Sequence, residues 1–144
     1  KRGLIVLAGA LLTFGFCDQV SNIVKHAVGR IRPLHDEFML ANGLNVLENG
    51  GGYSFFSAHA ANSFGLAFST FVGMKRCIGY GSSIMPKWLK VYGTWMFFWA
   101  TMVAVSRIFV GKHYLGDVIV GIIIGSLAGY AFARLSAYLA GKIR

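Results

Sequence analysis

The chain has 144 residues, of which 56% are hydrophobic and only 13% are charged. Soluble globular domains carry about 25% charged residues, so this composition excludes an ordinary soluble domain. In a soluble chain, the net charge of +9 would point to nucleic-acid binding. The positions of the cations, described below, lead to a different interpretation of this charge.

Four apolar stretches follow one another along the chain. They cover residues 3–24, 58–74, 88–105 and 114–139. Each is long enough, or nearly so, to cross a bilayer, because a spanning helix needs about 20 mostly apolar residues. We therefore predict an all-α protein, a polytopic transmembrane helical bundle with four spans, in which residues 1–144 form a single domain.

The first stretch, which follows Lys1 and Arg2, has an alternative interpretation as a signal peptide. It is too long for one and lacks the small-residue cleavage pattern. Asp18 is the one acid within it, and we expect this side chain to face other helices rather than lipid. Because no Met stands at its start, we expect the chain to begin inside a longer protein, with upstream helices missing.

The first helix is predicted to end near Lys25. The segment from Lys25 to Pro33 is too polar for hydrocarbon, and Pro33 disfavours an uninterrupted helix beyond it. The longest connection follows, residues 34–57, and it contains three consecutive glycines. Two interpretations of it stay open: a surface segment that shapes an entrance for substrate, or a plain surface linker.

The third and fourth stretches carry two different packing patterns. The third is rich in aromatic residues, which are typical of helix packing or of a belt at the membrane interface: Trp88, Trp95, Phe97, Phe98 and Trp99. In the fourth, Gly121, Gly125 and Gly129 are spaced by four residues. Small residues at this spacing let helices approach closely, so they predict a packed seam.

Most of the positive charge falls at one set of helix ends. If the four stretches alternate in direction, these cations share one side of the membrane: Lys1, Arg2, Lys75, Arg76, Lys87, Lys90, Lys142 and Arg144. Loops rich in Lys and Arg face the cytoplasm. We therefore interpret the charge as a topology signal rather than a sign of nucleic acid, and we predict a multi-pass protein of the cell (inner) membrane.

The unusual polar residues gather at the opposite ends. Counting crossings brings together the end of the first helix, the start of the second, and the junction of the third and fourth. The residues at these places are Lys25, Arg30, Arg32, Ser57, His59, Ser106, Arg107, Lys112, His113 and Asp117. For Lys112 or Arg30 alone, snorkelling of a long side chain from a helix end is an equally good explanation. It does not account for two histidines and an aspartate, so a functional site is indicated.

His113 and Asp117 are four residues apart at the start of a helix, so they lie on one helical face. A carboxylate that accepts a hydrogen bond from one imidazole nitrogen makes the other nitrogen a better nucleophile. The pair is therefore a candidate attacking unit. The alternative, a satisfied polar contact with no catalytic role, stays open for this pair, and likewise for His59 as a helix-end histidine.

Three cations from the same places, Lys25, Arg32 and Arg107, are candidates to surround a phosphoryl group. Arginine forks match phosphate oxygens in pairs, and lysine adds a compact point charge. Phosphoryl transfer depends largely on positioning and charge stabilisation, so we expect no metal and no other cofactor.

Two long-spaced motifs make these residues resemble the type 2 phosphatidic acid phosphatase superfamily, whose signature reads KxxxxxxRP, PSGH and SRxxxxxHxxxD. The first part runs from Lys25 to Pro33, and the third from Ser106 to Asp117, both with full spacing. In the middle part, Phe56 and Ala58 stand where the signature has proline and glycine. Replacement of glycine matters if that position needs an unusual backbone angle, so we expect a divergent but active site with a possible change in substrate range.

The resemblance implies a role for each residue. His113 would attack phosphorus and form a phosphohistidine, Asp117 would orient it, and His59 would protonate the leaving oxygen and later activate water. Other residues would hold the phosphate: Lys25, Arg32, Arg107, the hydroxyl groups of Ser57 and Ser106, and the backbone N–H of Ala58. Membrane members of the superfamily look like six-helix proteins, so the four predicted spans would be the C-terminal part of such a fold.

The resemblance also implies a phosphorylated membrane lipid as substrate. If the ends rich in Lys and Arg are cytoplasmic, the site opens to the periplasm or cell exterior. Undecaprenyl pyrophosphate, phosphatidylglycerophosphate, phosphatidic acid and lipid A phosphates are all consistent with it, and neither the substrate nor the oligomeric state can be read from the sequence. Three other functions stay open. One is a vanadate-dependent haloperoxidase, which would use the same pocket, although those enzymes are soluble and the four apolar stretches argue against it. Another is a non-enzymatic anion-binding or transport protein, and the third is a structural membrane protein that retains an inactive site.

Overall fold

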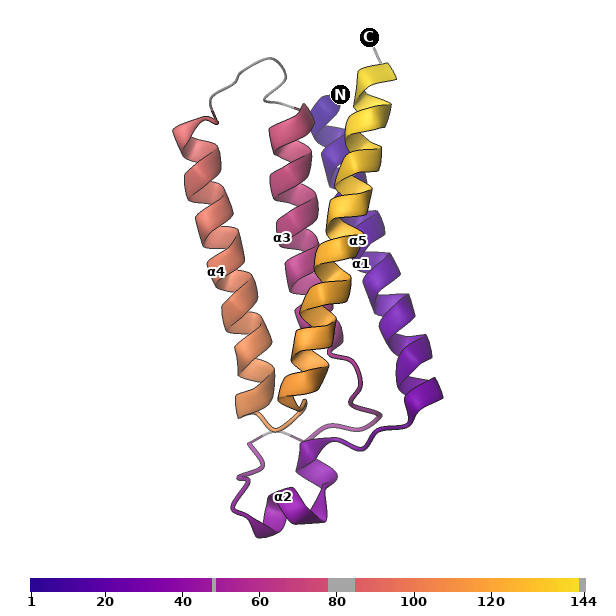
Figure 1. Cartoon of the computed structure of the whole chain (residues 1–144), viewed down its shortest axis with the longest axis vertical. Helices are drawn as coiled ribbons and strands as arrows, with labels where there is room; N and C mark the ends of the chain where they lie inside the picture. Colours follow the sequence, from indigo (N-terminus) through magenta and orange to yellow (C-terminus); the bar gives the residue numbers. More distant parts are fainter. Residues whose placement is uncertain (48, 78–84, 143–144) are drawn as a thin grey trace.

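In the computed structural model, which describes residues 1–47, 49–77 and 85–142, four long helices stand side by side as a bundle (Figure 1). They are α1 (Arg2–Val28), α3 (Ala58–Cys77), α4 (Lys87–Phe109) and α5 (Leu115–Lys142). A short 3-10 helix η1 (Pro33–His35) and helix α2 (Glu37–Ala41) lie beyond one end of the bundle. The predicted all-α fold is confirmed.

Each long helix extends beyond the apolar stretch that predicts it, except at the first residue of α5. The apolar stretches stop at the first polar residues, whereas the backbone continues its own hydrogen-bond ladder through them. By length and composition, the N-terminal helical segment that contains α1 and the helix α5 are apolar enough to cross a membrane. That α3 and α4 also cross, as four spans require, stays a prediction.

Helix α1 ends one turn later than predicted, at a glycine. Gly29 has φ 64°, in the left-handed region that favours glycine, and its N–H donates to the carbonyl of Lys25. This cap stops the helix and turns the chain sideways. As a consequence, Arg30 and Arg32 leave the axis of α1 and run across the end of the bundle.

The glycine seam predicted in α5 is confirmed by its contacts with α3. A Cβ atom added at Gly125 would lie 2.1 Å from the carbonyl oxygen of Ala61, and one added at Gly129 would lie 2.4 Å from that of Gly65. Backbones this close leave no room for a side chain. The seam therefore fixes how the start of α5 sits against the start of α3, which is where the candidate site lies.

A glycine contact positions α1 against α5, and aromatic packing positions α4 against α3. On α1, a Cβ at Gly9 would meet the hydroxyl of Ser136 on α5, whereas Gly15 has nothing within 4 Å. On α4, Phe97 packs against Phe68 with ring centroids 4.9 Å apart. Trp95 is 65% exposed, so the aromatic residues of α4 divide into a packing group and an outward-facing group.

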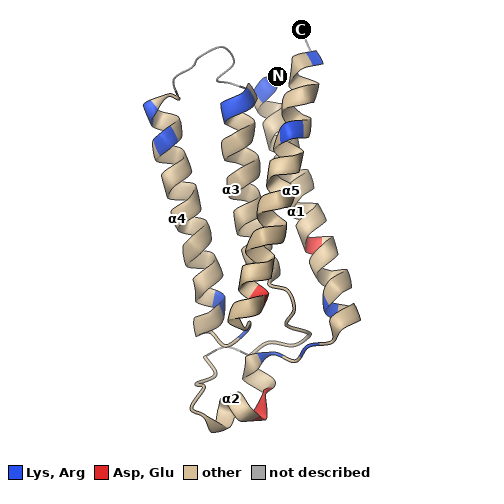
Figure 2. Ribbon diagram, in the orientation of Figure 1, with Lys and Arg blue, Asp and Glu red and all other residues tan. Residues whose placement is uncertain are grey.

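The arrangement of the helix ends agrees with the crossing count. The end of α1, the start of α3 and the α4–α5 junction lie together at the end of the bundle that carries α2 (Figure 1). The opposite end, with both termini, carries a concentration of Lys and Arg and no acidic residue among those described there (Figure 2). The structure thus separates a mixed-charge end from a purely basic end.

The long connection is tied to the α4–α5 junction. Leu34 donates its N–H to the carbonyl of Gly111 at 3.0 Å, and the hydroxyl of Tyr114 donates to Oδ2 of Asp36 at 2.5 Å. Further along, the N–H of Ser54 donates to the carbonyl of Arg30 at 2.7 Å. These contacts favour the interpretation in which the connection helps to shape the site.

Candidate active site

Asp117 lies at the centre of the polar cluster and is completely buried. Its Oδ1 accepts a hydrogen bond from Nη1 of Arg30 at 3.0 Å. Its Oδ2 accepts one from the hydroxyl of Ser54 and one from the backbone N–H of Tyr114 at 2.9 Å. A buried carboxylate is stable only when it is paired and hydrogen-bonded, and these three donors meet that requirement.

The backbone of Asp117 also joins two helices. Its carbonyl oxygen accepts a hydrogen bond from the N–H of Ser57 at 3.0 Å. Ser57 is buried directly before α3, and its hydroxyl oxygen accepts from the N–H of Ala60 at 3.4 Å, as an N-terminal cap does. One aspartate therefore connects the start of α5 to the start of α3 and to the segment of Ser54.

His113 is buried beside this carboxylate, with 3% of its surface exposed. Its Nδ1 lies 3.8 Å from Oδ2 of Asp117, which is beyond hydrogen-bond distance, and Nδ1 finds no partner among the described residues. Burial lowers the pKa of His113, and the nearby cations Arg32 and Lys25 lower it further, against the opposing effect of Asp117. The imidazole is therefore neutral at neutral pH, which is the form that can act as a nucleophile.

His59 stands in the first turn of α3, at the edge of the same cluster. Its imidazole is exposed and within electrostatic reach of His113, Arg107, Lys25 and Lys112. The two histidines thus lie at one end of the bundle, as predicted. This placement rules out the arrangement that would have separated them across the membrane.

The three predicted cations converge from different segments. Lys25 is in the last turn of α1 and is within electrostatic reach of Arg32 and Asp117. Arg32 donates from Nε to the carbonyl of Gly52 at 3.3 Å, and burial lowers its pKa. Arg107, in the last turn of α4, donates a hydrogen bond to the side chain of Ser106.

Ser106 makes two hydrogen bonds through its hydroxyl. The oxygen accepts from Nε of Arg107 at 3.1 Å, and the proton is donated to the carbonyl of Val103 at 2.7 Å. Its proton is therefore directed into its own helix. In this structure Ser106 orients Arg107, and a direct bond from Ser106 to phosphate stays a prediction.

Lys112 belongs with these cations although the motif does not name it. A Cβ added at Gly50 would lie 3.3 Å from Cε of Lys112 and 3.5 Å from Nη1 of Arg32. Gly50 therefore occupies a gap between two cationic side chains that has little room for a larger residue. This close approach explains one of the three consecutive glycines in the long connection.

The departure at Ala58 needs no left-handed backbone, whereas Phe56 follows a cis peptide bond to Phe55. Among residues 1–47, 49–77 and 85–142, no residue other than glycine has a positive φ, so Ala58 does not need the freedom of glycine. Phe56 is completely buried in the core with Cys17 and Ala61. Ala58 begins α3, where the first backbone N–H groups have no partner within the helix and favour an anion.

Sequence reasoning missed two of the groups that hold Asp117. Arg30 was grouped with the clustered cations, but its pairing with Asp117 was not predicted, and Ser54 was not singled out at all. The spacing of a motif gives no signal for Ser54, because it reaches Asp117 from 63 residues away through a loop without regular structure. The stacking of Arg30 over the ring of Tyr114, 4.2 Å from its centroid, was equally unforeseen.

A cavity of about 320 Å³ opens beside His59. Its walls come from α1, α3 and α4 and are mostly apolar: Phe14, Asp18, Ala58, His59, Asn62, Ser63, Leu66, Trp99 and Val103. Asp18 lines this cavity but is exposed, so its facing other helices rather than lipid stays a prediction. Within the part of the chain that the structure describes, no group of three or more His, Cys, Asp or Glu side chains is placed to hold a metal ion.

Comparison with known proteins agrees with this arrangement. The family model of the PAP2 superfamily matches residues 3–140, so the chain belongs to that superfamily, which confirms the resemblance found in its motifs. The fold also matches the crystal structure of the first transmembrane PAP2-type phosphatidylglycerolphosphate phosphatase from Bacillus subtilis, with a TM-score of 0.65 and 24% identity, over 94% of this chain and 59% of that one.

Among curated proteins, the chain is similar to two lipid A 4'-phosphatases. It is 31% identical to that of Bacteroides thetaiotaomicron over 147 residues, covering 100% of this chain and 60% of the relative. It is 29% identical to that of Porphyromonas gingivalis over 140 residues, covering 96% and 54% respectively. The chain therefore spans somewhat more than half the length of these relatives.

Proposed function

We propose that this chain forms the catalytic part of a membrane-embedded, metal-independent lipid phosphatase. The observation that carries the proposal is the convergence of a buried neutral His113, a second histidine and several cations at one end of the bundle. Anion-binding alone would need the cations but gives no reason for a buried imidazole set beside a carboxylate. Membership of the PAP2 superfamily supports the same reading.

In the proposed reaction, Nε2 of His113 attacks the phosphorus and the bond to the lipid oxygen breaks. His59 gives its proton to that departing oxygen, and a phosphohistidine remains. His59 then takes a proton from water as the water oxygen attacks phosphorus, which releases inorganic phosphate and restores His113. The guanidinium and ammonium groups of Arg32, Arg107 and Lys25 balance the charge on the phosphoryl oxygens throughout.

Asp117 would stabilise the charge that develops on His113. The separation of 3.8 Å between Nδ1 and Oδ2 is too long for this without a small movement, and catalytic hydrogen bonds often tighten only when substrate binds. Arg30 and Ser54 keep the carboxylate ionised and oriented meanwhile. They would therefore act on the reaction through Asp117, as positioning residues.

The substrate we propose is a phosphate monoester or pyrophosphate on a membrane lipid. The mostly apolar cavity beside His59 gives a lipid chain a place next to the phosphate site. Because two relatives are lipid A 4'-phosphatases, a phosphate on lipid A is the first candidate, before undecaprenyl pyrophosphate, phosphatidylglycerophosphate and phosphatidic acid. The purely basic end of the bundle would face the cytoplasm, which puts the site at the periplasmic or exterior surface.

The test is phosphate release by the full-length protein in detergent from a panel of these four lipids, with and without EDTA. We expect release that survives EDTA and is lost in His113→Ala. His26→Ala is the matched control, because His26 is an exposed histidine whose ring contacts Tyr53 and which has no role in the proposed reaction, and it should retain activity. Loss of release in EDTA would contradict the metal-free mechanism, and release by His113→Ala would remove His113 from its role.

A further inference from the structure

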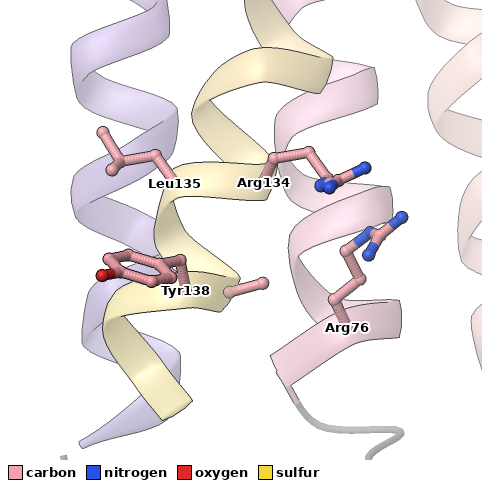
Figure 3. Close-up of a pocket in the computed structure, with 5 residues that line it drawn as sticks. Arg76, Arg134, Leu135 and Tyr138 are labelled. Atoms are coloured by element: carbon pink, nitrogen blue, oxygen red, sulfur yellow. The ribbon is translucent and has the colours of Figure 1, made fainter. Parts of the chain in front are cut away.

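A second basic site lies at the far end of the bundle, away from the phosphatase cluster. Figure 3 shows Arg76 of α3 and Arg134 of α5 extending from neighbouring helices beside a cavity of about 500 Å³. The cavity is lined by these two arginines with Leu135, Ala137 and Tyr138. None of the motifs or proposed catalytic steps uses these residues.

The positive charge around this cavity has no acidic counterpart. The cavity lining contains two guanidinium groups and no Asp or Glu among its described residues, and the sequence has no acidic residue in 49–116 or after Asp117. Nη1 of Arg134 donates to the hydroxyl of Tyr130 at 3.2 Å, and Arg76 is within electrostatic reach of the same phenol. Two arginines that converge without a carboxylate are a binding arrangement for an anion with several oxygen atoms.

The depth of this cluster matches a lipid headgroup. Arg134 follows Asp117 by 17 positions on α5, and at 1.5 Å per residue the two are about 26 Å apart along the helix axis. The hydrocarbon layer is about 30 Å thick. With α5 as a membrane span, Arg134 is therefore at the headgroup level of the leaflet opposite the phosphatase site. Helix-end topology signals alone do not explain it, because Arg134 is two turns before the end of α5.

An apolar groove lies beside the cavity, at the same depth along α5. It has a volume of about 220 Å³, runs between α1 and α5, and shares Leu135 with the basic cavity. Its other lining residues are Ile5, Ala8, Gly9, Leu12, Phe132, Ser136 and Leu139. From Ile5 to Leu12 the groove extends about 10 Å along α1. A basic cavity with an apolar groove beside it fits a molecule with a phosphate and a hydrocarbon chain.

We infer that Arg76 and Arg134 bind the phosphate of an anionic phospholipid from the leaflet at the basic end, with one acyl chain in the groove beside Leu135. Basic pockets between transmembrane helices on the cytoplasmic side commonly hold such headgroups. This site is separate from the phosphatase cluster, and the inference does not depend on the proposed activity. The bound lipid would link α3 to α5 at the basic end of the bundle, beyond the glycine seam of α5.

The test uses the full-length protein in detergent and follows the shift of its unfolding midpoint as lipid is added. We expect dioleoylphosphatidylglycerol to raise the midpoint, and dioleoylphosphatidylcholine and inorganic phosphate to have little effect. In the double variant Arg76→Gln/Arg134→Gln, the apparent affinity for phosphatidylglycerol should fall about 25-fold, or about fivefold for each arginine removed. The matched control Lys87→Gln/Lys90→Gln removes the same charge from exposed positions on α4 at the same end, and it should keep the wild-type affinity.

Each contrary result has a definite meaning. An equal effect of phosphatidylcholine, or an equal loss of affinity in the Lys87/Lys90 control, would overturn the site. Saturating stabilisation by inorganic phosphate alone would show a free-anion site and overturn the lipid assignment. If the glutamine variant does not fold, Arg76→Lys/Arg134→Lys keeps the charge but not the forked geometry. If this lysine variant binds phosphatidylglycerol more weakly than wild type but above background, the site is supported. If it binds phosphatidylcholine and phosphatidylglycerol equally, with the wild-type affinity, the site is contradicted.

Discussion

Replacement of Ser54 by alanine tests whether the buried carboxylate of Asp117 must be held for the site to work. Ser54→Ala removes one of the three donors to Asp117 and leaves Arg30 and the Tyr114 N–H in place. A hydrogen bond to a charged group contributes about 1.5–3 kcal/mol. If that free energy keeps Oδ2 aimed toward His113, its loss should lower kcat by roughly 10- to 150-fold, with KM little changed because Ser54 does not reach the phosphate site.

The assay is phosphate release from the best lipid of the panel, with kcat and KM measured separately and folding checked by thermal unfolding. Ser21→Ala is the matched control. Ser21 is also a buried serine, but its hydroxyl has no hydrogen-bond partner among the described residues and it lies on α1 outside the cluster. Its removal should change neither kcat nor KM. If Ser54→Ala and Ser21→Ala behave alike, Asp117 does not need Ser54, and the positioning role proposed for it is wrong.

Three further predictions concern the pH dependence of activity, the pH dependence of stability, and helix packing. Because burial lowers the pKa of His113, activity that needs its neutral form should persist as the pH falls to the ordinary histidine value of about 6.5 and decline only below it. If kcat/KM already decreases as the pH is lowered toward 6.5 from above, the assignment is contradicted. The same shift means that the unfolded state binds more protons near that pH, so stability should decrease as the pH falls through about 6.5, as measured by thermal unfolding. Gly125→Ala should destabilise the protein by at least about 1–3 kcal/mol, because its Cβ would lie 2.1 Å from the carbonyl oxygen of Ala61. Gly15→Ala is the control and should not destabilise it, because nothing lies within 4 Å of that Cβ. Equal thermal unfolding midpoints for the two variants would refute the seam.

The sequence predicts the helices well because long apolar helices carry their signal locally. A long apolar stretch is sufficient to indicate each of α1, α3, α4 and α5, and the four-residue glycine spacing in α5 is sufficient to indicate its contact with α3. The helix ends are less predictable. The end of α1 depends on Gly29, whose left-handed conformation is a property of one residue and not of the surrounding composition.

The candidate site is predictable to the extent that its residues belong to long-spaced motifs. His113, Asp117, Lys25, Arg32 and Arg107 come together because three helix ends meet, and alternation of direction is enough to bring those ends together. Their catalytic roles stay predictions. The groups contributed by the long connection were not foreseen, since Ser54 and Gly50 reach the site through tertiary contacts that no periodicity encodes.

Asp117 links catalysis and folding, and this complicates the most obvious experiment on it. Its carboxylate holds Arg30 and Ser54, and its carbonyl holds the N–H of Ser57, so three segments depend on one residue. Asp117→Ala would leave the buried Ser54 hydroxyl without an acceptor, at a cost of about 1–3 kcal/mol, and would release the exposed Arg30 guanidinium from its carboxylate. Loss of activity in that variant would therefore mix misfolding with lost chemistry. Ser54→Ala and Arg30→Gln separate the two effects, because each removes one contact of the carboxylate and leaves the carboxylate itself in place.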